Sequence, residues 1–291
     1  MNPVLRPALS LEFFPPKTAE MEQRLWQAIT ALTPLKPRFV SVTYGAGGTT
    51  RDRTHATVAR IRATTALEPA AHLTCVGATR AEIDDVARRY WQAGVRHIVA
   101  LRGDPPDGLG KRYTPHPGGY AFAADLVAGL KRVGDFQISV AAFPETHPEA
   151  ASPEADLDNL KRKIDAGADT AITQYFFEAA TFLRFRDRAR AKGIAVPIVP
   201  GLLPIVNFQQ AVAFSRACGA AVPARLHKRF AGLEDDPKGR HDAAVEVAAG
   251  LARELAAGGA EALHIYTLNR AGLTRDICAA IGLAGAGSAA A

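Results

Sequence analysis

Several apolar runs of this chain end in polar and ionisable residues. Residues 97–101 are followed at once by Arg102, Gly103 and Asp104, and Glu12 lies in the apolar stretch SLEFF. Loss of hydration among apolar neighbours raises a carboxyl pKa, so Glu12 is a candidate general acid near neutral pH. An ion-paired glutamate in the protein interior is the alternative. Asp104 precedes a proline, where aspartate is also an ordinary turn residue.

A second group of polar residues has helical spacing. Asp156, Asn159 and Lys163 fall on one face of a predicted helix over 156–167, and Arg162 lies beside them. Two cations, together with free backbone N–H groups at the start of a helix, suit a pyrophosphate. Taken alone, such a stretch is more typical of a solvated helix face.

The elements that must position these residues are short strands that alternate with helices. Continuously apolar runs are typical of parallel strands buried on both faces. Eight such runs in 291 residues predict an α/β fold, a (β/α)8 TIM barrel, as one catalytic domain over 1–282. An open doubly wound sheet is the alternative, weakened because no GxGxxG follows the first strand. The predicted strands are 8–14, 38–44, 70–76, 97–103, 137–143, 170–176, 196–202 and 263–269, and the predicted helices include 19–32, 80–94, 156–167 and 179–193, with extra helices around 207–218, 223–231 and 239–257 between strands seven and eight.

Composition excludes other classes of protein. Lys and Arg exceed Asp and Glu by 35 to 29, but the basic residues are dispersed, so no nucleic-acid partner is expected. No apolar run reaches the roughly 20 residues of a membrane span, and no signal peptide is recognisable. Three widely spaced cysteines fit a cytoplasmic location, and no motif has metal-ligand spacing. The Gly/Ala-rich tail 283–291 is expected to be flexible.

Eight stretches together resemble the methylenetetrahydrofolate reductase family. They are LEFFPPKT, FVSVTYGAGGTTRDRT, AHLTC, VALRGDPP, VAAFPETHPEA, DLDNLKRKIDAGADTAITQYFF, PGLLPIVNFQQ and HIYTLNRA, in the family's order from about residue 10 to about residue 282. The resemblance is to the compact bacterial type, and it implies a (β/α)8 barrel with FAD at its carboxyl face. It also implies reduction of methylenetetrahydrofolate to 5-methyltetrahydrofolate by ping-pong hydride transfer from NADH or NADPH through flavin N5. The resemblance further implies a homodimer or homotetramer in the cytoplasm.

The resemblance also implies roles for individual residues. Glu12 matches the general acid that protonates N10 of the folate as its ring opens, and Asp104 matches an aspartate beside flavin and pterin. The residues that match FAD contacts are Thr43, His72, Arg102, Gly103, Asp104, Tyr120, Ala121, Phe143, His147, Asp156, Asn159, Arg162 and Lys163, with Phe143 standing where the family often has tyrosine. The residues that match the shared folate and nicotinamide site are Glu12, Asp104, Gln174, Gln210, Phe214, Leu268 and Arg270.

Other functions stay open at the level of sequence. A Schiff-base lyase or aldolase needs a lysine at a strand end, and none of the eight predicted strands supplies one. A folate- or flavin-binding barrel without reductase activity would use the same pocket, as would a flavin-independent reductase with direct hydride transfer. The presence of Glu12, Asp104 and Gln174 together favours a catalyst.

Overall fold

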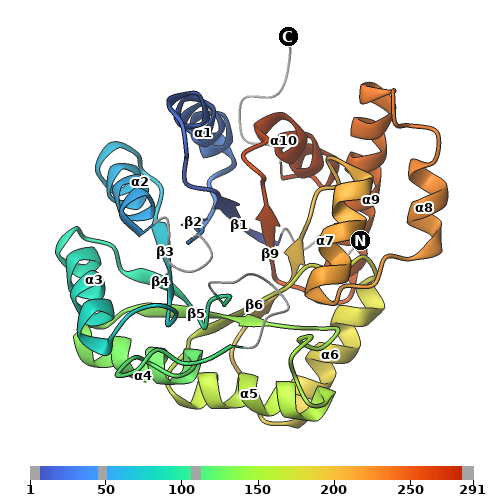
Figure 1. Ribbon diagram of the computed structural model, residues 1–291. Helices are drawn as coiled ribbons and strands as arrows, with labels where there is room; N and C mark the ends of the chain where they lie inside the picture. The colour runs from blue at the N-terminus through green and yellow to red at the C-terminus, as the bar shows by residue number, and fades with distance from the viewer. Residues whose placement is uncertain (1–6, 45–50, 106–112, 284–291) are drawn as a thin grey trace.

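The computed structural model describes residues 7–44, 51–105 and 113–283, so most of the predicted tail lies outside the described residues. Its strands form one parallel sheet that curves into a nearly closed barrel (Figure 1). The sheet order is β7-β6-β5-β4-β3-β2-β1-β9-β8. The predicted TIM-barrel fold is therefore confirmed. The strands are β1 (Ala8–Phe13), β2 (Phe39–Val42), β3 (Pro69–Thr74), β4 (His97–Leu101), β5 (Gln137–Ala142), β6 (Thr170–Thr173), β7 (Ile198–Val199), β8 (Gly201–Leu202) and β9 (Ala262–Tyr266).

The predicted strand 196–202 is divided in two at Pro200. Its first half, β7, pairs with β6, and its second half, β8, pairs with β9. A proline cannot donate to a strand ladder, which explains the break. Tyr266 bridges the same seam, because its hydroxyl donates to the carbonyl of Thr173 over 2.7 Å. Gly201 leaves room for this bond, since a Cβ there would lie 2.7 Å from the Tyr266 hydroxyl.

Helices surround the strands on the outside of the barrel (Figure 1). Local caps fix where several of them begin: Thr79 and Glu82 form a capping box at the start of α3, and Ser152 caps α5. The three extra helices predicted between the last two strands are confirmed as α7, α8 and α9. The helices are α1 (Ala19–Leu32), α2 (Arg51–Thr64), α3 (Arg80–Gln92), α4 (Ala123–Val133), α5 (Pro153–Asp165), α6 (Ala179–Ala191), α7 (Phe208–Cys218), α8 (Ala224–Phe230), α9 (Pro237–Ala257) and α10 (Ala271–Ala280), with a 3-10 turn at η1 (Thr33–Leu35).

Alternation along the strands separates an apolar layer from a polar barrel interior. On β1, Leu11 and Phe13 belong to the main hydrophobic core. Ser10 and Glu12 alternate with them and contact His264 of β9. The barrel interior therefore carries ionisable side chains directly below its carboxyl-end mouth. In the described part of the chain, no helix combines the length and apolar character needed to cross a membrane.

Candidate active site

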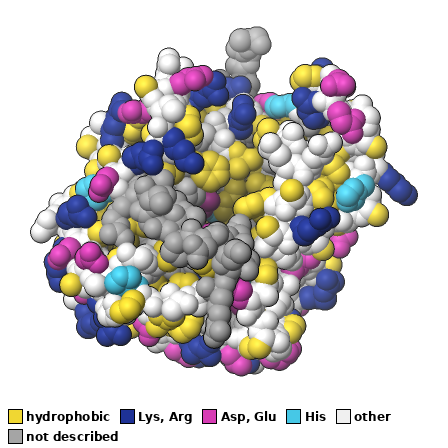
Figure 2. Space-filling model, in the orientation of Figure 1, with side chains coloured by type: hydrophobic (Ala, Val, Ile, Leu, Met, Phe, Trp, Pro, Cys, Tyr) yellow, Lys and Arg dark blue, Asp and Glu magenta, His cyan; other side chains and the backbone are white. Residues whose placement is uncertain are grey.

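A cavity of about 1060 Å³ opens at the carboxyl ends of the strands. Its walls come from the ends of β1 to β6 and β9 and from the loops and helices that follow them. Figure 2 shows hydrophobic side chains gathered in a hollow near the centre of the visible face. Large exposed aromatic residues border the cavity: Phe14, Phe122 and Phe214 are 39%, 50% and 49% exposed. Exposed aromatic rings around a hollow are typical of a site for a flat ligand.

Most of the residues predicted to act lie together in this cavity. The active sites of TIM barrels lie on this face, so the strand-end reasoning located the cavity correctly. The predicted residues that line it are Glu12, Thr43, His72, Arg102, Gly103, Asp104, Phe143, His147, Asp156, Asn159, Arg162, Lys163, Gln174, Phe214 and Leu268.

Tyr120 and Ala121 do not line the cavity. Tyr120 is buried, and its hydroxyl donates to Asp84 over 2.7 Å. Phe122 and Ala123, where α4 begins, line the cavity wall. The predicted FAD contacts of Tyr120 and Ala121 stay a prediction, and Phe122 is a cavity residue that the sequence did not single out.

Gln210 and Arg270 also lie outside the cavity wall. Both side chains are exposed, Gln210 in the first turn of α7 and Arg270 at the N-cap of α10. Their predicted partners on the same segments, Phe214 and Leu268, do line the cavity. The helix and turn geometry therefore places one member of each pair at the site and the other at its edge.

Glu12 lies deep in the cavity against two histidines. Its Oε2 atom is 3.3 Å from Nε2 of His72 and 3.4 Å from Nε2 of His264. The Ser41 hydroxyl also donates to Oε2, over 3.4 Å. Behind this group, Nδ1 of His264 lies 2.8 Å from the Ser10 hydroxyl. Strands β1, β2, β3 and β9 thus bring an acid and two bases together in the barrel interior.

The expected protonation of Glu12 is wrong in this structure. Burial alone would raise its pKa, but the charges and hydrogen bonds of His72 and His264 outweigh burial and lower the pKa to about 2. The carboxylate contacts two imidazoles, as the paired alternative predicts, rather than an apolar setting. The physical reason lies in tertiary structure, because sequence neighbours suggested an apolar setting whereas β3 and β9 supply imidazoles.

Helix α5 supplies the cationic end of the cavity. Asp156, Asn159 and Lys163 share its cavity-facing side, as their spacing predicts. The helix begins at Pro153, however, so Arg162 and Lys163 lie in its last turns, and the expectation that they flank a helix N-terminus is wrong. Proline at the first helical position and the cap before it explain the earlier start.

Lys163 is a buried cation. Its Nζ donates to the carbonyl of Ala141 over 2.5 Å, and only 5% of the residue is exposed. Burial lowers its pKa to about 8, although Asp156 acts in the opposite direction. The Asp156 carboxylate also accepts from the His147 backbone N–H over 2.9 Å. A helix therefore brings a lysine to a strand end, where inspection of the strands alone found none.

An ion pair joins two of the loops that wall the cavity. Both terminal nitrogens of Arg102 donate to the carboxylate of Glu149, over 2.6 and 3.0 Å. The guanidinium also stacks on Tyr113, 4.5 Å from the ring centre. Gly103 follows with a φ of +87°, and a Cβ there would lie 2.7 Å from a methyl group of Val76. Packing and backbone conformation thus require this glycine.

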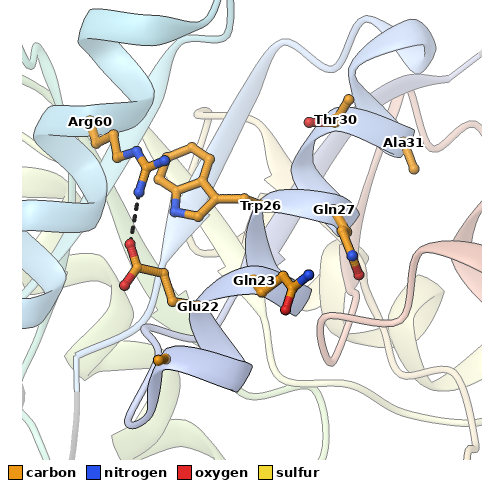
Figure 3. Close-up of a pocket in the computed structure, with 8 residues that line it drawn as sticks. Glu22, Gln23, Trp26, Gln27, Thr30, Ala31 and Arg60 are labelled. Carbon is orange, nitrogen blue, oxygen red and sulfur yellow. Dashed lines mark hydrogen bonds and ion pairs between the residues drawn. The ribbon is translucent and has the colours of Figure 1, made fainter.

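A second hollow lies between α1 and α2 and has a different character. Arg60 covers the ring of Trp26 at 4.0 Å and pairs with Glu22, which Figure 3 shows with the lining residues of α1. Its charged groups neutralise one another rather than converge on open space. Within the described ranges, no three His, Cys, Asp or Glu residues are grouped so as to hold a metal ion. The barrel-mouth cavity is therefore the candidate active site.

Comparisons with known proteins show which family the chain resembles. The family model described as methylenetetrahydrofolate reductase matches residues 5–282. The 5,10-methylenetetrahydrofolate reductases of Salmonella typhimurium and Escherichia coli are each 52% identical over 275 residues, which cover 94% of this chain and 90% of each relative. A solved structure of an uncharacterized protein from Clostridium thermocellum that binds two copies of 5-methyl-5,6,7,8-tetrahydrofolic acid has a TM-score of 0.61. It is 14% identical and covers 96% of this chain and 94% of its own, which shows the fold alone.

Proposed function

The chain belongs to the methylenetetrahydrofolate reductase family of oxidoreductases, and we propose that it reduces 5,10-methylenetetrahydrofolate to 5-methyltetrahydrofolate with NADH or NADPH as donor. The observation that carries the proposal is the cavity itself. It combines an acid–base group at Glu12, a buried cation at Lys163 and aromatic walls in one space. These are the parts that a hydride transfer to a ring-opening folate requires.

The cationic end of the cavity fits FAD. Lys163 is desolvated without a bidentate partner, so a cofactor diphosphate would stabilise its charge, and Arg162 and Asn159 lie on the same wall. His147 accepts from the Glu149 backbone N–H at Nδ1 over 3.0 Å, which leaves its Nε2 as a donor when the ring is neutral. When bound, FAD supplies a centre that accepts hydride from a nicotinamide and passes it to the folate.

Flat rings of the two substrates are proposed to share the wall formed by Tyr175 and Phe214. The Tyr175 and Phe214 rings stack with their centroids 6.0 Å apart and an interplanar angle of 22°, and Phe214 is half exposed at the cavity mouth. Gln174 and Leu268 line the same region. Because one wall serves both ligands, the nicotinamide must leave before the folate enters, and the kinetics should be ping-pong.

Glu12 is proposed to deliver a proton to N10 as the five-membered ring opens. In the structure, the nearby imidazoles keep this carboxyl ionised. A substrate that fills the cavity removes water from Glu12 and strengthens the burial effect that raises its pKa. The carboxyl group can then take up a proton and donate it to N10. Asp104, half-buried on the same wall, would stabilise the cation left on N5.

A visible absorption spectrum of the purified protein tests this function. Flavin bands that bleach with anaerobic NADH and return with methylenetetrahydrofolate would support both halves of the reaction. A colourless protein that FAD cannot reconstitute would refute the flavin-dependent reaction and favour direct hydride transfer. Glu12→Gln should still bleach with NADH but regain its colour slowly with the folate. The exposed Glu20→Gln serves as the matched control.

A further inference from the structure

The turn after β9 has an unusual backbone. Leu268 and Asn269 both adopt left-handed conformations, with φ of +51° and +54°. Asparagine tolerates this region, but a leucine there costs on the order of 1 kcal/mol or more. The turn is closed by the Arg270 backbone N–H, which donates to the Thr267 carbonyl over 2.8 Å. Such strain persists only where surrounding contacts impose it, and it is concentrated at functional sites.

The contacts that impose it reach the end of β1. The Thr267 hydroxyl and backbone N–H both donate to the carbonyl of Glu12, over 2.6 and 3.1 Å. The Asn269 side chain makes two hydrogen bonds to the Phe14 backbone. Its oxygen accepts from the Phe14 N–H over 3.0 Å, and its NH2 group donates to the Phe14 carbonyl over 3.1 Å. The Asn269 backbone N–H in turn donates to the Thr267 hydroxyl over 3.1 Å.

These side chains replace a strand ladder that has ended. The β1–β9 pairing stops at Glu12 opposite Tyr266, although the chain continues along the cavity to Phe14. On its other side, the end of β1 is held by β2, where the Thr43 N–H donates to the Phe13 carbonyl over 2.9 Å. Without the Asn269 side chain, Phe13 and Phe14, which directly follow Glu12, would be held on one edge only.

We propose that Thr267 and Asn269 are positioning residues for the folate half of the reaction, acting through the backbone of Glu12 and Phe14. They hold the Glu12 carboxyl against His72 and keep the Phe14 ring at the cavity mouth. This inference rests on the proposed function, because it gives Glu12 its place against the substrate. The strained turn also directs the Leu268 side chain into the same cavity.

Two pairs of variants separate this role from backbone strain. Glycine and aspartate at position 269 both tolerate a positive φ. Asn269→Gly removes both side-chain hydrogen bonds to Phe14, whereas Asn269→Asp removes only the bond donated to the Phe14 carbonyl. Thr267→Val loses the hydroxyl bonds at nearly the same shape, and Thr267→Ser keeps them. Amide hydrogen exchange of the peptide 8–16 in the folate-free protein reports directly on the hydrogen bonds to Phe14. The values of kcat and KM for the folate report how loss of these bonds affects catalysis.

We expect Asn269→Gly and Thr267→Val to speed exchange at Phe14 and to lower kcat for folate reduction about tenfold, with Thr267→Ser close to wild type. A loosened Glu12 should also shift the pH profile of kcat upward, which a merely structural defect would not do. Unchanged exchange, or unchanged kcat and pH profile in an active protein, would overturn the proposal. A wild-type protein without folate reduction would instead refute the proposed function.

Discussion

Acidification from pH 7 to pH 5 is expected to destabilise this protein through His97. This residue lies on β4 inside the barrel and is 6% exposed. Its Nε2 is 2.8 Å from the Ser139 hydroxyl, and its ring meets Phe39 edge-on at 4.4 Å. Burial lowers its pKa to about 4, with Asp169 acting in the opposite direction. The imidazole is therefore neutral in the folded protein throughout this pH range.

The sign of the effect follows from the two protonation equilibria. The unfolded chain takes up the His97 proton near pH 6.5, whereas the folded chain does so only near pH 4. Between these values the unfolded state binds more protons, so stability is present above pH 6.5 and is lost as the pH falls towards 4. For one such histidine, the free energy of unfolding should fall by about 2 kcal/mol between pH 7 and pH 5.

Urea unfolding at pH 7, 6 and 5 measures this loss. His97→Gln retains a side chain that can bond Ser139 but cannot titrate, so its stability should depend less on pH by about 2 kcal/mol over the range. His227→Gln, at an exposed position of α8, serves as the control for removal of a histidine. The window stops at pH 5 because the carboxylates have scarcely begun to titrate there. Equal pH dependence in wild type and His97→Gln would refute the reasoning.

Two further predictions concern the cavity wall. Gly103→Ala should lower the free energy of unfolding by about 2 to 4 kcal/mol, because the new Cβ would clash with Val76 and the backbone would keep a positive φ. Gly118→Ala, where φ is +71° and no atom lies within 4 Å of the new Cβ, should lower it by only about 1 kcal/mol in the same urea assay. Equal losses in the two variants would contradict the steric argument. Lys163→Met should weaken FAD binding about tenfold or more in a fluorescence titration without lowering the free energy of unfolding. Lys161→Met, on the outer side of α5, should leave the affinity for FAD unchanged. Equal affinities of the two variants would place the diphosphate elsewhere.

The fold was predictable because its signal is local. Short, mainly apolar runs mark the parallel strands, and helix α3 starts after a capping residue that can be read directly, whereas the cap that starts α5 was overlooked. The closure of the barrel was not predictable. Whether the segment around Pro200 makes one strand or two depends on which neighbours lie on its two sides, and those neighbours are distant in the sequence.

The candidate site divides in the same way. Strand ends and helical spacing were enough to bring Asp104, Gln174 and Lys163 to one cavity. The protonation of Glu12 was beyond such reasoning, because His264 lies 252 residues away in sequence and acts only across the barrel. Phe122 was missed for another reason: a lone phenylalanine before a helix is ordinary in sequence, and only the folded structure places it on the cavity wall at the start of α4.

The two ends of the cavity differ in how their charges are stabilised, and this difference suggests a different role for each end. Lys163 keeps its charge against burial with a backbone carbonyl and a nearby Asp156, so an incoming anion would add stabilisation that the protein alone does not provide. Glu12 already has two imidazoles, so a further cation would add little there. What Glu12 can do is take up a proton when a ligand excludes water. We therefore propose that the lysine end binds an anion and that the glutamate end moves a proton.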